Sequence, residues 1–100
     1  MKFYNPELQK LFNEPEKFEE FTKKQTLIVN NEKINNLTLK GVKIHRAEFN
    51  NSTMKEVDFS GSIIENPTFK NPEFHALKWQ NAVLSNVVFE NVKMNLIKFK

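Results

Sequence analysis

The chain has 100 residues, the size of one domain, and its 39% hydrophobic and 27% charged residues are an ordinary globular composition. It has no cysteine, which excludes disulfides, thiolate zinc sites and cysteine nucleophiles. Its net charge of +3 comes from residues 27–100, with ten basic and seven acidic side chains, and is too mild to indicate nucleic-acid binding. No signal segment or membrane span is recognisable, so we expect a cytoplasmic protein.

Residues 1–26 predict two short helices. Asn5 is a capping residue, Pro6 suits the first helical turn, and Glu7 is acidic where helix N-termini favour acids. A second helix is predicted to begin at Pro15 and Glu16. The apolar positions of the two helices are Leu8, Leu11, Phe12, Phe18 and Phe21. We expect this segment to cap the repeats that follow, and a separate partner-binding module is the alternative.

Residues 27–100 repeat with a period of five, and a large apolar side chain occupies every fifth position. The fifteen centres of the repeat are Val29, Ile34, Leu39, Ile44, Phe49, Met54, Phe59, Ile64, Phe69, Phe74, Trp79, Leu84, Phe89, Met94 and Phe99. Two positions before each centre stands a small or medium side chain, with Glu32 the single charged exception. A helix does not fit, because five is far from the helical period of about 3.6 residues.

The spacing also predicts the path of the chain. In an extended segment, residues two apart face the same side, so each centre and the residue two before it point inward. This phase persists only if the chain turns a corner in every repeat. At the position two after the centre, eight of fourteen residues are asparagine and two more are Gly41 and Gly61, which tolerate tight turns. The pattern predicts an all-β solenoid of stacked parallel strands rather than a β-sandwich of hairpins.

Two stretches, VDFSG at 57–61 and AEFNN at 47–51, resemble the pentapeptide-repeat family. The family pattern is a small residue, Asp or Asn, Leu or Phe, a small polar residue, and Gly or a similar residue. The resemblance covers 27–100 and implies a right-handed, four-sided (quadrilateral) parallel β-helix with about twenty residues per coil, hence about 3.7 coils.

The number of sides follows from the resemblance alone. A spacing of twenty stacks Phe49 and Phe69 under Phe89, but a spacing of fifteen stacks Phe59 and Phe74 under Phe89 equally well. With four sides, the corner residues Asn31, Asn51, Asn71 and Asn91 form an asparagine ladder. The predicted core stack consists of Phe49, Phe69, Phe89, Phe59, Phe74, Trp79, Leu39, Ile44 and Ile64.

The C-terminal end of the repeat is predicted to be open, because the sequence stops at NLIKFK inside the repeat and leaves apolar side chains and a strand edge uncovered. We expect two copies to meet there across a twofold axis, and the alternative is that 1–100 is a module of a longer protein. The outward residues Ile63, Val83 and Val88 form a second, smaller candidate patch. The predicted homodimer interface consists of Leu84, Phe89, Met94, Ile97 and Phe99.

No catalytic, cofactor-binding or metal site is predicted. The only histidines, His45 and His75, face outward on opposite sides of a four-sided coil, so they cannot share a metal. Ser60 and Ser85 lack a base at usable spacing, and Asp58 has no carboxylate partner for acid and base roles. An enzyme is therefore not expected.

The sequence instead predicts a structural repeat protein whose rigid surface binds a macromolecule, in the first place a protein. The family resemblance adds a second hypothesis, because some members imitate duplex DNA and protect DNA gyrase from inhibitors. Their surfaces are strongly acidic, and the net positive charge here disfavours that role. Nucleic-acid binding by the C-terminal lysines is disfavoured because the repeat aromatics point inward.

Overall fold

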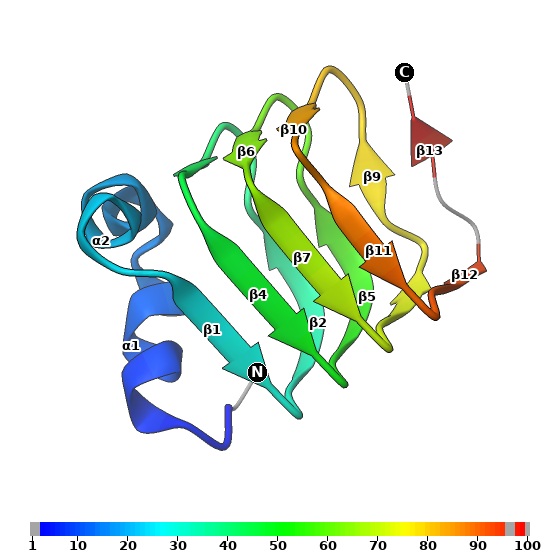
Figure 1. Cartoon of the computed structure of the whole chain (residues 1–100), viewed down its shortest axis with the longest axis horizontal. Helices are drawn as coiled ribbons and strands as arrows, with labels where there is room; N and C mark the ends of the chain where they lie inside the picture. Colours follow the sequence, from blue (N-terminus) through cyan, green and yellow to red (C-terminus); the bar gives the residue numbers. More distant parts are fainter. Residues whose placement is uncertain (1–2, 96–97, 100) are drawn as a thin grey trace.

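The computed structural model, which describes residues 3–95 and 98–99, is a parallel β-solenoid preceded by short helices (Figure 1). The helical segment consists of α1 (Pro6–Asn13), the 3-10 turn η1 (Pro15–Lys17) and α2 (Phe18–Lys24). Figure 1 shows α1 and α2 at one end of the stack of strands and β10 to β13 at the other. The solenoid predicted from the five-residue period is thereby confirmed.

The described strands form three sheets. The first contains β1 (Leu27–Asn30), β4 (Ala47–Asn50), β7 (Pro67–Lys70) and β11 (Val88–Glu90). The second contains β3 (Lys43–Ile44), β6 (Ile63–Glu65) and β10 (Val83–Ser85). The third contains β2 (Lys33–Thr38), β5 (Thr53–Asp58), β8 (Glu73–His75), β9 (Lys78–Trp79), β12 (Lys93–Asn95) and β13 (Lys98–Phe99). Each strand pairs in parallel with the strand one coil away, which excludes the β-sandwich of hairpins.

The register between coils is twenty residues. Leu27 lies opposite Ala47 and Ala47 opposite Pro67, while Phe49 lies opposite Phe69 and Phe69 opposite Phe89. The structure therefore decides between the two spacings that the sequence leaves open. Aromatic centres stack on aromatic centres: the Phe49 and Phe69 rings have centroids 5.1 Å apart and the Phe69 and Phe89 rings 5.2 Å apart.

The predicted corners are confirmed by the backbone. Twelve residues two positions after a centre have positive φ, the left-handed conformation that favours glycine and asparagine. They are Asn31, Asn36, Gly41, Asn51, Glu56, Gly61, Asn66, Asn71, Ala76, Asn81, Asn86 and Asn91. Arg46 departs from the series, and its Nη2 instead donates to the carbonyl oxygen of Lys23 in α2 at 3.0 Å.

The predicted asparagine ladder is present from Asn51 to Asn91. Asn71 Nδ2 donates to Asn51 Oδ1 and Asn91 Nδ2 donates to Asn71 Oδ1, both at 3.1 Å. A second corner has the same bond, from Asn86 Nδ2 to Asn66 Oδ1. An asparagine at these corners thus both tolerates the left-handed backbone and ties one coil to the next.

The helices begin close to where the sequence predicts. Asn5 caps α1, because its side-chain oxygen accepts the backbone N–H groups of Glu7 at 2.9 Å and Leu8 at 3.3 Å. The predicted second helix starts as the 3-10 turn at Pro15, and its α-helical part begins only at Phe18. Phe3, Leu8, Phe12 and Phe18 are buried in one continuous cluster with the first repeats, so the helices share the solenoid core.

Glu32, the one charged residue in an inward position, links the helical segment to the first coil. Its side chain is 2% exposed, and its two carboxylate oxygens accept the backbone N–H groups of Tyr4 at 2.8 Å and Asn5 at 3.1 Å. Its own N–H donates to Ser52 Oγ in the next coil. These bonds compensate the burial of a carboxylate, which explains the exception in the pattern.

Candidate functional site

The predicted core residues lie inside the solenoid, with one correction. Leu39, Ile44, Phe49, Phe59, Ile64, Phe69, Phe74 and Trp79 are buried. Phe89 stacks on Phe69, but it is 40% exposed and is therefore not a buried core residue. The physical reason is its position: β11 pairs on one side with β7, and no described strand pairs with its other edge.

The last described coil exposes apolar side chains. Phe89 and its neighbour Val88 are exposed, and Leu84 and Val87 are half-buried against the core. Val83 on β10 is 56% exposed and lies opposite the exposed Ile63 on β6. The predicted lateral residues are thus exposed too, and they adjoin the last coil.

The remaining residues of the predicted dimer interface are described only in part. In the strand register, Met94 on β12 lies opposite Phe74 and Phe99 on β13 lies opposite Trp79. Ile97 lies outside the described residues. Of the predicted interface residues, Leu84 on β10 and Phe89 on β11 have described side chains.

A second feature lies on the six-stranded sheet, where the corner formed by Asn36, Glu56 and Ala76 departs from the sequence rule. We call these three residues the central corner. Glu56 has φ of 55° and Ala76 has φ of 53°, and the other ten left-handed corner residues are all asparagine or glycine. A side chain with a Cβ and no local hydrogen-bonding group makes this conformation costly. The sequence shows glutamate and alanine at these two corner positions, but the five-residue pattern does not connect them with a function.

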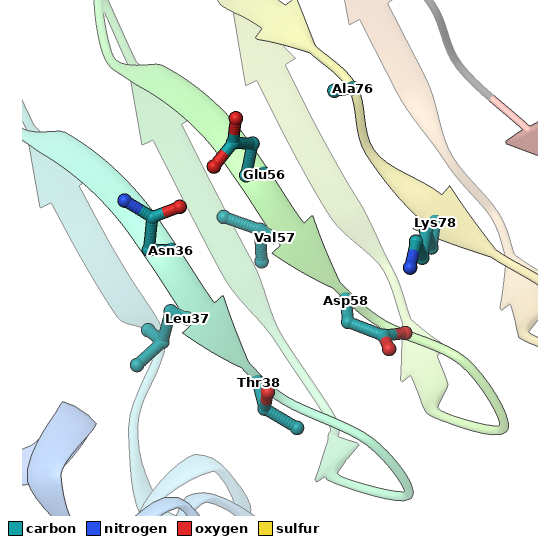
Figure 2. Close-up of a pocket in the computed structure, with 8 residues that line it drawn as sticks. All are labelled: Asn36, Leu37, Thr38, Glu56, Val57, Asp58, Ala76 and Lys78. Carbon is teal, nitrogen blue, oxygen red and sulfur yellow. The ribbon is translucent and has the colours of Figure 1, made fainter.

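The central corner borders a hollow of about 350 Å³. Figure 2 shows its lining residues on three neighbouring segments: Asn36, Leu37 and Thr38, then Glu56, Val57 and Asp58, then Ala76 and Lys78. A second hollow, of about 560 Å³, lies on the other side of the same corner and shares Glu56 and Ala76. Its other lining residues are Lys33, Thr53, Lys55, Glu73 and His75.

Asp58 is a carboxylate of this surface that two neighbouring groups hold in place. Its Oδ1 accepts the Ser60 N–H at 2.9 Å, and its Oδ2 lies 3.7 Å from Lys40 Nζ. Partial burial opposes ionisation, but the Ser60 hydroxyl and amide and the charges of Lys40 and Lys78 outweigh it and hold the pKa of Asp58 below its ordinary value. Asp58 is therefore a fixed negative charge in the hollow at neutral pH.

The two histidines occupy separate places, and neither is isolated. His45 Nδ1 lies 2.8 Å from Glu65 Oε1, and His45 Nε2 lies 3.8 Å from Glu19 Oε2 of α2. The backbone N–H of His45 donates to Thr22 Oγ1 at 2.9 Å, a second contact to α2. His75 Nε2 lies 3.5 Å from Glu73 Oε2. The sequence did not predict that His45 joins the helical segment to the solenoid.

Comparison with known proteins adds no relative. No protein-family model matches the chain, and no curated protein resembles it significantly. In the described part of the chain, no helix has the length and apolar character needed to cross a membrane. Among residues 3–95 and 98–99, no group of three or more histidine, cysteine, aspartate or glutamate side chains is placed to hold a metal ion.

Proposed function

We propose that this protein is a non-catalytic repeat protein that presents a rigid surface to a protein partner and pairs with a second copy through its last coil. The observation that carries the pairing is the incomplete burial of apolar centres in the last described coil, where Phe89 is exposed and Leu84 half-buried. Exposed apolar side chains beside open strand edges favour association.

A second copy is the occupant that fits this end best. The helices cover one end of the stack, and no described element lies beyond the last coil at the other (Figure 1). Two copies related by a twofold axis bury both open ends at once and leave no further edge, so the assembly closes as a dimer. A head-to-tail contact would instead need the helix-covered end as a partner surface.

The same proposal includes the finer description of the fold. We propose a right-handed, four-sided β-helix of the pentapeptide-repeat type. The twenty-residue register and the left-handed corners every five residues support four sides. The VDFSG and AEFNN stretches support the family and, through it, the right-handed winding. A cytoplasmic location belongs to this proposal as well.

The mass in solution tests the pairing. We expect sedimentation equilibrium of the wild type to give twice the monomer mass of 11.8 kDa, and Phe89→Asp to give the monomer mass. Phe89→Ser, a smaller polar change of the same exposed side chain, checks the result if Phe89→Asp unfolds.

Ile28→Asp is the matched control, because Ile28 is an exposed strand residue of the first coil, far from β11 in the stack. This variant should stay dimeric. A wild type that remains monomeric at high concentration, or a control that dissociates as readily as Phe89→Asp, would refute pairing through the last coil.

A further inference from the structure

We draw no further inference here: the strongest candidate, the outward apolar patch of Ile63 on β6 and Val83 on β10 beside the last described coil, adjoins the surface already assigned to the dimer contact, and nothing in the structure shows what else covers it.

Discussion

Single residues at the corners carry the conformational cost of this fold. Each corner needs a left-handed backbone, and asparagine or glycine supplies it at ten of the twelve such corners. Glu56 and Ala76 have no such advantage, and the cost for an L-residue with a Cβ is about 1 kcal/mol. The ladder bond between Asn51 and Asn71 shows a second benefit of asparagine that glycine cannot give.

We predict that Ala76→Asn raises the free energy of unfolding by about 0.5–1 kcal/mol, because asparagine tolerates positive φ better than alanine. The reverse substitution at another corner is the control: Asn81→Ala should lower it by a similar amount, since Asn81 has φ of 61°. Urea unfolding of both variants measures the difference. A loss of stability in Ala76→Asn would contradict this account of the corner.

At the scale of elements, a few polar contacts join the helical segment to the first coil. Glu32 holds the residues that precede α1, and Thr22 Oγ1 in α2 accepts the N–H of His45 in the coil. Arg46 does not adopt the left-handed corner conformation, and its side chain donates a hydrogen bond to the last turn of α2. The first coil is thus joined to its helices through three residues, and two of them, Glu32 and Arg46, stand where the repeat pattern is broken.

We predict that Glu32→Ala lowers the free energy of unfolding by about 2–3 kcal/mol, because two N–H groups lose a charged acceptor in a buried site. Glu90→Ala, an exposed glutamate on β11, should change stability by less than about 0.5 kcal/mol.

Hydrogen exchange locates the effect of Glu32→Ala. The amides of α1 should exchange faster than in the wild type, since the chain that leads into the helix is no longer held. Unchanged protection of α1 would mean that the apolar contacts of Leu8 and Phe12 alone position the helix.

At the scale of the whole molecule, stability depends on columns that pass through every coil. The Phe49, Phe69 and Phe89 rings stack nearly parallel, with interplanar angles of 11° and 13°. Phe69 lies between the other two and is fully buried, whereas Phe89 is partly exposed on the last coil. Since a coil buries its side chains only against its neighbours, the position in the stack decides how much a residue contributes.

We predict that Phe69→Ala lowers the free energy of unfolding by about 3–5 kcal/mol, the usual cost of a large cavity in a core. Phe89→Ala should cost only about 1–2 kcal/mol when measured on dilute, monomeric protein, because less apolar surface leaves contact with the core. Chemical denaturation of both variants provides the comparison. Equal losses would contradict the graded burial along the column.

The sequence by itself determined the solenoid, the inward residues, the corners and the capped start of α1, because each depends on local rules. Alternation of side chains, the backbone preference of asparagine and helix capping act within a few residues. A five-residue period that follows from such local rules can be recognised in the sequence without knowing which strands pair.

Only the tertiary structure decided the twenty-residue register and the bonds of Glu32 and His45. These features join residues twenty or more positions apart, and several spacings satisfy the same local pattern. Which residues become neighbours depends on how the coils close and stack, and that closure brought the central corner and its two hollows together.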